Sequence, residues 1–144
     1  MSRIHAIIAG LIIFLSMNSL ATAEPETLAP CPESPNCVSS QAGDSAHYIE
    51  PLVLQGDPQA DWERLRAIIA AQPRTTITEE SLNYLHAEVR SLVFRFVDDL
   101  EFLRIPAEQL VHVRSASRTG YSDFGVNRRR VERIQRLLSE QRND

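Results

Sequence analysis

Residues 110–138 read LVHVRSASRTGYSDFGVNRRRVERIQRLL, and this stretch decides the predicted fold. It begins as a strand, because Val111 and Val113 alternate with polar residues. A polar turn follows over residues 115–123, where Gly120 is suited to unusual backbone angles. The stretch ends as an amphipathic helix whose apolar positions recur at helical spacing: Val131, Ile134 and Leu138.

The sequence leaves the start of this helix open, because Asn127, Asp123 and Ser122 are all suitable N-caps. The arginines at 128–130 would oppose the helix dipole from the first turn if Asn127 were the cap. A start nearer Asp123 places them one turn deeper, and we expect that start.

A further helix is predicted ahead of the sheet, with Asp57 as its N-cap and Pro58 at its first position. Pro73 ends it near residues 71–72. Its apolar face consists of Trp62, Leu65, Ile68 and Ile69.

Between the two helices we expect four strands, over residues 75–78, 82–90, 96–105 and 110–117. Short connections favour antiparallel pairing of sequence neighbours. The sequence therefore predicts an α+β domain over residues 57–144. Its expected architecture is a four-stranded antiparallel meander sheet with two amphipathic helices on one face, in the order α-β-β-β-β-α.

Residues 1–23 are typical of a secretory signal peptide, with Arg3 before an apolar run and cleavage expected after Ala23. The apolar run covers residues 6–17 and is shorter than the roughly 20 residues of a membrane span. Because Glu24 rather than cysteine follows the cut, we expect no lipid attachment there. The predicted location is periplasmic or secreted, without a stable membrane anchor after cleavage; a retained anchor is the alternative.

Residues 24–56 are predicted to form an extended Pro-rich arm across the domain surface, with a short edge strand at 47–49. Cys31 and Cys37 are the two cysteines of the chain. A close pair in an exported protein favours one disulfide. A redox or zinc pair is the alternative, but the spacing is not that of thioredoxin and no further cysteine exists for zinc.

Composition limits the expected partners of the chain. The net charge is −4, which gives the chain no reason to bind nucleic acid or anionic membranes. All 15 basic residues are arginine, whose planar guanidinium group suits oxyanions.

Strand alternation sorts the side chains of the sheet between its two faces. The face under the helices should carry Leu85, Val89, Leu100, Phe102, Val111 and Val113. The opposite face, which we call the polar sheet face, should carry His86, Glu88, Arg90, Asp99, Glu101, His112 and Arg114. It is expected to be either a solvated set of ion pairs or a polar binding face.

The histidines suggest two kinds of enzyme site. His86 and Glu88 point the same way, and His112 could join them as ligands for zinc or non-haem iron. The spacing matches no specific metal motif, so we predict no metal and no cofactor. Serine chemistry is disfavoured because no G-x-S-x-G elbow or S-x-x-K accompanies the serines near His112.

The turn before the last helix is the candidate ligand site, because arginine forks and hydroxyl groups gather beside a helix start. Its residues are Arg114, Ser115, Ser117, Arg118, Tyr121, Ser122 and Asp123. We expect Arg114 and Arg118 to lie beside the N-terminus of that helix and to accept an anion. The competing explanation is internal, with Asp123 or Glu88 occupying the same guanidinium groups.

Four stretches resemble the bacterial family known as domain of unknown function 1499: CPESPNCVSS at 31–40, YLHAEVR at 84–90, RFVDDLEF at 95–102 and VHVRSASRTGYSDFGVNRRRVERI at 111–134. The resemblance implies a small exported or membrane-attached protein without an established activity. It supplies no catalytic residues to carry over.

The expected function is that of a small exported binding or interaction module, acting on an envelope protein or a small anionic ligand. The alternative is a small periplasmic hydrolase or metal-dependent enzyme that uses the polar sheet face. The enzyme alternative requires His86 and His112 to converge with Glu88 or Asp99 in one pocket.

Overall fold

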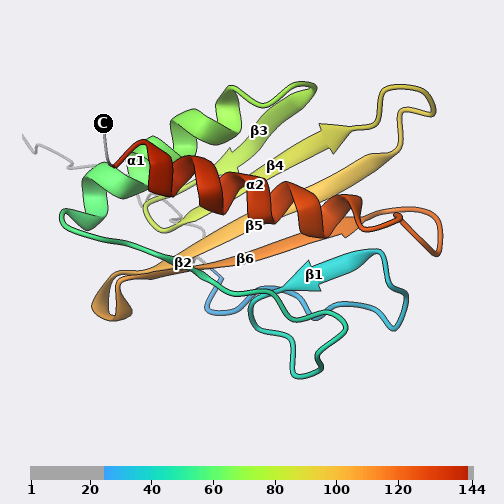
Figure 1. The fold of residues 1–144 in the computed structure, drawn as a ribbon, viewed down its shortest axis with the longest axis horizontal. Helices are drawn as coiled ribbons and strands as arrows, with labels where there is room; N and C mark the ends of the chain where they lie inside the picture. The colour runs from blue at the N-terminus through green and yellow to red at the C-terminus, as the bar shows by residue number, and fades with distance from the viewer. Residues whose placement is uncertain (1–24, 143–144) are drawn as a thin grey trace, which may run out of the picture.

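The computed structural model describes residues 25–142, and the predicted signal peptide lies outside this range. The fold is α+β, with one antiparallel sheet and two helices, as predicted (Figure 1). The elements in chain order are β1 (Cys37–Ser39), β2 (Leu52–Val53), α1 (Pro58–Ala70), β3 (Thr75–Glu80), β4 (Tyr84–Arg90), β5 (Val97–Ile105), the 3₁₀ turn η1 (Pro106–Glu108), β6 (Leu110–Ser117) and α2 (Val126–Glu140).

The sheet has six strands, so the prediction of four is wrong, and so is the order α-β-β-β-β-α. The four predicted strands, β3 to β6, do pair as an antiparallel meander. The spatial order is β1-β6-β5-β4-β3, and β2 pairs with β6 beside β1. Both additional strands come from the Pro-rich arm.

The arm covers the outer edge of β6, whose backbone groups would otherwise face water unpaired. Cys37 pairs with Ala116, and Leu52 pairs with Val111. These strands are too short to show an alternation that sequence reading could detect. The edge strand expected at residues 47–49 is wrong, because this segment makes only an isolated bridge between Tyr48 and Ser39. The predicted Cys31–Cys37 disulfide is present at the start of β1.

Helix α1 begins as its capping residues predict. The Asp57 carboxylate accepts a hydrogen bond from the Gln59 N–H at 2.9 Å, and Pro58 occupies the first turn. The predicted apolar face of this helix is buried: Trp62, Leu65, Ile68 and Ile69.

Helix α2 begins at Val126 with Gly125 as its N-cap, so none of the three predicted caps holds that position. Gly125 has a φ of 75°, which glycine adopts without strain. Asp123 nevertheless serves the helix start, because its carboxylate accepts from the backbone N–H of Asn127 at 2.8 Å. Arg128 and Arg129 therefore do stand in the first turn, and the Asp123 carboxylate lies at the same end of the helix.

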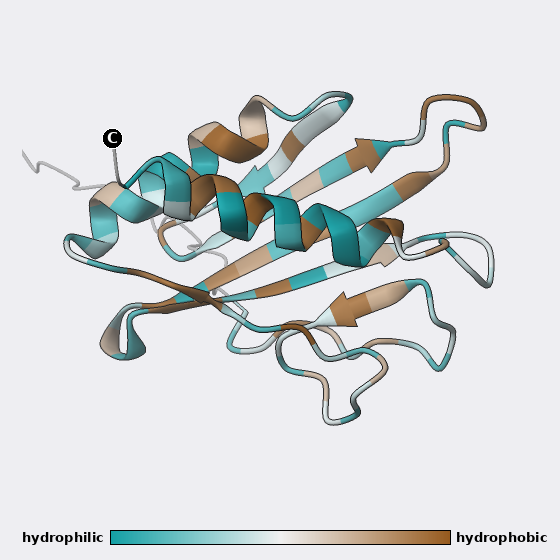
Figure 2. Ribbon diagram, in the orientation of Figure 1, coloured by the Kyte–Doolittle hydropathy of each residue, from teal (hydrophilic) through white to brown (hydrophobic). Residues whose placement is uncertain are grey.

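The core lies between the sheet and the two helices, which Figure 1 shows on the same face. Leu85 pairs with Phe102, which in turn pairs with Val113, so one buried row crosses three strands. Of the predicted core residues, only Val89 is partly rather than fully buried. Figure 2 shows the matching division on α2, with hydrophobic positions toward the sheet and hydrophilic positions outward.

Two charged residues share the parity of this core row, and each is satisfied by a helix. Asp98 pairs with Arg130 of α2 at 2.6 Å. Arg104 donates to Gln59 of α1 and lies over the ring of Trp62, 5.2 Å from its centroid.

Within residues 25–142, no helix is long and apolar enough to cross a membrane.

Candidate functional site

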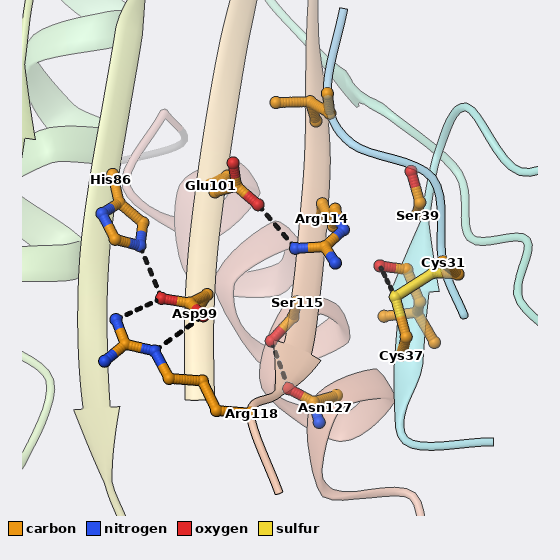
Figure 3. Close-up of polar contacts among 12 residues, drawn as sticks. Cys31, Cys37, Ser39, His86, Asp99, Glu101, Arg114, Ser115, Arg118 and Asn127 are labelled. Atoms are coloured by element: carbon orange, nitrogen blue, oxygen red, sulfur yellow. Dashed lines mark hydrogen bonds and ion pairs between the residues drawn. A yellow bond between two sulfur atoms is a disulfide. The ribbon is translucent and has the colours of Figure 1, made fainter. Parts of the chain in front are cut away.

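The polar sheet face carries the charged residues that alternation predicts, and they pair with one another (Figure 3). Arg114 of β6 donates to Glu101 of β5 at 2.7 Å, and both side chains are about 15% exposed or less. The Tyr84 hydroxyl donates to the second oxygen of Glu101 at 2.9 Å. Burial raises the pKa of Tyr84, and the neighbouring Glu101 charge adds to the effect, so this phenol remains a donor.

A second cluster on this face is centred on Asp99. Two guanidinium nitrogens of Arg118 donate to the Asp99 carboxylate, at 2.9 and 2.7 Å, and Arg118 also donates to Glu88 at 2.7 Å. His86 approaches the same carboxylate at 2.8 Å. The Arg118 hydrogen bonds, with help from His86, lower the pKa of Asp99 below its usual value of 3.8 although burial opposes the change.

His86 also joins Asp99 to a hydroxyl, because its Nδ1 atom lies 2.8 Å from the Thr78 oxygen. This order of hydroxyl, imidazole and carboxylate is that of a nucleophile, a base and an orienting acid. However, the Asp99 charge is already taken up by the guanidinium of Arg118. Competition for that charge weakens the support that an orienting acid gives to a catalytic base.

The two histidines of this face do not meet. His86 bonds within the β3–β5 part of the sheet, whereas His112 of β6 lies 3.1 Å from the Ser40 hydroxyl of the arm. No group of three or more potential metal ligands gathers among residues 25–142. The convergence that the enzyme alternative requires is therefore missing from the described part of the chain.

The turn residues are divided between the two sides of the sheet. Ser115 is fully buried on the helix side, where it donates to the Asn127 side chain at 2.6 Å. The Asn127 amide in turn donates to Ser117 and Asp123, at 2.9 and 2.8 Å. Tyr121 and Ser122 are exposed. This arrangement ties the turn to α2 through protein groups alone.

The expected placement of Arg114 and Arg118 beside the N-terminus of α2 is wrong, because both pair with sheet carboxylates. At the helix start, Asp123 accepts from the backbone N–H groups of Gly125 and Asn127. Burial alone would raise the pKa of Asp123, but these hydrogen bonds hold it below its usual value. The competing internal explanation holds for Glu88, which accepts from Arg118, whereas Asp123 bonds to Gly125 and Asn127 instead of an arginine.

A different group of arginines surrounds a pocket on the helix side of the sheet. The pocket has a volume of about 270 Å³ and lies between the α1–β3 connection, the ends of β4 and β5, and the first turns of α2. Its apolar lining residues are Val89, Val126 and the fully buried Leu100. We call it the arginine pocket, after Arg74, Arg129, Arg130 and Arg133 in its lining.

Most of these guanidinium groups lack a carboxylate partner. Arg130 is the exception, since it pairs with Asp98. Arg74 donates to the Arg90 carbonyl at 3.1 Å, and Arg129 donates to the Phe124 carbonyl at 2.8 Å. Within residues 25–142, no ion pair involves Arg74, Arg129 or Arg133. No acidic residue lines the pocket either.

Sequence reasoning missed this pocket although part of its signal was present. Arg129 and Arg133 are four residues apart, which places them on one face of a helix. The contribution of Arg74 was not readable, because it depends on how the α1–β3 connection packs beside α2. Arg74 has a φ of 54°, an unusual value for a residue other than glycine.

Two other pockets each have a single charged lining residue. One of about 360 Å³ lies within the arm, and Asp44 is its only charged lining residue. One of about 150 Å³ lies between β2 and the end of α2. Thr78 lines none of the three, so the hydroxyl–imidazole–carboxylate chain has no pocket among them for a substrate.

Comparison with known proteins places the chain in a family without assigning it an activity. No curated protein matches it. A family model described as "Protein of unknown function (DUF1499)" matches residues 27–138, and the chain therefore belongs to that family, as the resemblance predicts.

Proposed function

We propose that this protein is a small binding module for an anionic molecule carrying a short apolar group, held in the arginine pocket. The observation that carries the proposal is the set of arginines around the pocket that have no acidic partner within residues 25–142. Guanidinium groups form paired, directional hydrogen bonds to phosphate or carboxylate oxygens. An anion would give Arg129 and Arg133 the counter-charge that they lack.

The size and apolar lining of the pocket narrow the class of ligand. Its volume of about 270 Å³ is close to the lower end of small-molecule sites, which begin at roughly 300 Å³. Val89 is partly buried and Val126 is exposed, so these two residues supply the accessible apolar surface of the pocket. This surface would contact a short carbon chain, while the charged group remains at the arginines.

Export through residues 1–23 remains a prediction, and the proposed ligand would then be met in the periplasm or outside the cell. A role in catalysis is not proposed. The hydrolase or metal-dependent alternative depended on converging histidines, and His86 and His112 have separate partners.

The test is calorimetric titration of the purified protein with inorganic phosphate and with butyl phosphate. We expect butyl phosphate to bind more tightly, because its carbon chain contacts the apolar surface. Replacing Arg129→Gln together with Arg133→Gln should weaken binding by about tenfold or more, since charge-assisted hydrogen bonds are lost.

Arg136→Gln is the matched control. Arg136 is an exposed arginine of the same helix and does not line the pocket, so its replacement should leave binding unchanged. Equal weakening by Arg136→Gln would mean that only the net charge of α2 matters. Failure of the wild-type protein to bind either phosphate would overturn the proposal.

A further inference from the structure

The hairpin between β4 and β5 exposes a run of large apolar side chains. Residues 91–96 read SLVFRF, and Leu92, Val93 and Phe94 are each at least 74% exposed. Figure 2 shows this hairpin as a hydrophobic tip at one end of the molecule. The rings of Phe94 and Phe96 stack on each other at 5.5 Å rather than packing into the core. A hairpin needs no such residues, because polar turns serve as well.

A second loop at the same end of the sheet has the same character. In the loop between β6 and α2, Phe124 is 87% exposed and Tyr121 is also exposed, as is Val126 at the start of α2. The two loops are connected by backbone pairing, since the Arg118 N–H donates to the Val97 carbonyl at 3.0 Å. We call Leu92, Val93, Phe94, Phe96, Tyr121 and Phe124 the apolar loop tips.

The hairpin is held in shape by its own hydrogen bonds, and the second loop contains a strained residue. The Ser91 N–H donates to the Phe96 carbonyl, and the Phe96 N–H donates to the Ser91 hydroxyl, so the hairpin is closed from both sides. Phe124 has a φ of 52°, which is costly for a bulky residue. An exposed phenylalanine in that conformation gains nothing from burial in the isolated protein. A contact outside the protein would compensate both the backbone strain at Phe124 and the exposure of its ring.

The unpaired charge beside the tips is positive. Arg95 stands in the middle of the apolar hairpin, is exposed, and has no ion pair within residues 25–142. The arginine pocket opens at the same end, because Arg74 bonds to the carbonyl of Arg90 just before the hairpin. The carboxylates of this end are bonded to protein donors: Glu88, Asp98, Asp99 and Asp123. Local charge therefore differs in sign from the net charge of −4.

We propose that the apolar loop tips dock this end of the protein onto an anionic phospholipid surface. Projecting loops that carry phenylalanine, tyrosine and leucine beside arginine combine apolar insertion with attraction to lipid headgroups. Figure 1 shows two separate projecting loops, whereas a protein interface uses a continuous, closely packed face. A net charge of −4 disfavours binding to anionic membranes, but the positive charge gathered at this end of the fold removes that objection.

The experiment is sedimentation of the purified protein with vesicles of phosphatidylcholine alone and with vesicles of equimolar phosphatidylcholine and phosphatidylglycerol. We expect binding to the mixed vesicles, little binding to phosphatidylcholine alone, and release by added salt. Phe94→Ser together with Phe124→Ser should weaken binding by about tenfold or more, because the two rings proposed to insert into the lipid surface are lost.

Leu82→Ser is the matched control. Leu82 is 71% exposed but lies in the β3–β4 hairpin at the opposite end of β4, so its loss should leave vesicle binding unchanged. Equal weakening by this control, or no binding of the wild-type protein to mixed vesicles, would overturn the proposal. The proposal would also be overturned if analytical ultracentrifugation showed a wild-type dimer that dissociates when Phe94 and Phe124 are replaced. The apolar loop tips would then bind a second copy of the protein.

The vesicle and phosphate experiments test the two proposals separately, so one proposal can fail while the other stands. The Phe94 and Phe124 replacements leave the pocket lining intact and should not change butyl phosphate binding. Arg129→Gln with Arg133→Gln should weaken phosphate binding while leaving the apolar loop tips in place.

Discussion

The polar sheet face and the arginine pocket are both rich in arginine, yet only the pocket has positive charge to spare. On the polar sheet face, Arg114 and Arg118 are matched to carboxylates at hydrogen-bonding distance. In the pocket, Arg129 and Arg133 have no acidic partner within residues 25–142. The density of charged residues in a sequence therefore does not locate a binding site; the pairing of those residues does.

The difference follows from the geometry of the two kinds of element. Antiparallel strands bring side chains from different parts of the chain opposite one another, so Glu101 faces Arg114 directly. On a helix, residues four apart share a face, and Arg129 and Arg133 place like charges together. The sheet neutralises its arginines, whereas the helix gathers them.

The largest stability effect is expected from breaking the best buried pair of the polar sheet face. Arg114→Gln leaves Glu101 with the Tyr84 hydroxyl as its remaining donor in the contacts described. We expect the free energy of unfolding to fall by about 1–3 kcal/mol, the cost of an unsatisfied buried group. Urea denaturation measures it.

Glu101→Gln added to Arg114→Gln should restore part of that loss, because the uncompensated carboxylate disappears. A single variant as stable as the wild type would show that the polar sheet face is not held by its ion pairs. The contrast with the arginine pocket would then lose its basis.

A smaller effect, dependent on pH, is expected at Asp99. Its pKa is lowered in the folded protein, so its ion pairs stabilise the fold above the usual value of 3.8. That stabilisation is lost as the pH falls through the folded pKa. Asp99→Asn should therefore destabilise the protein at pH 7 and make progressively less difference under acid conditions. Urea denaturation of both proteins across the acid range measures this, and an equal difference at every pH would contradict it.

The smallest effect is expected in the arginine pocket. Arg129→Gln with Arg133→Gln should change the free energy of unfolding by no more than about 0.5 kcal/mol, as for other exposed positions. Relief of the repulsion between like charges four residues apart makes a slight gain the expected sign. Thermal melting checks it, with Arg136→Gln as the control. A large loss of stability would mean that these arginines hold the fold together and are not free for a ligand.

Much of the fold was predictable because its signals are local. Asp57 and Pro58 marked the start of α1, and the alternation of β4 to β6 assigned Leu85, Phe102 and Val113 to the buried face. The two arm strands were not predictable. They form because the edge of β6 needs backbone partners, and that need carries no side-chain pattern.

The candidate site was predicted less well, because it depends on contacts between distant segments. The sequence drew attention to the turn before the last helix and assigned free guanidinium groups to Arg114 and Arg118, neither of which lines the arginine pocket. Their partners lie on β4 and β5, across the sheet. The exposure of Phe94 and Phe124 was equally hidden, because apolar residues in a sequence are ordinarily expected inside.

The sequence by itself determined the two helices, the four strands β3 to β6, the two faces of the sheet and the disulfide, because periodicity, capping and cysteine spacing act over a few residues. Tertiary structure alone decided which charges cancel. Whether an arginine is neutralised depends on a carboxylate within about 4 Å, and in this fold that carboxylate comes from another strand. No acidic residue lines the arginine pocket, so Arg129 and Arg133 are not neutralised in this way. The pocket lies at the end of the molecule where the apolar loop tips project.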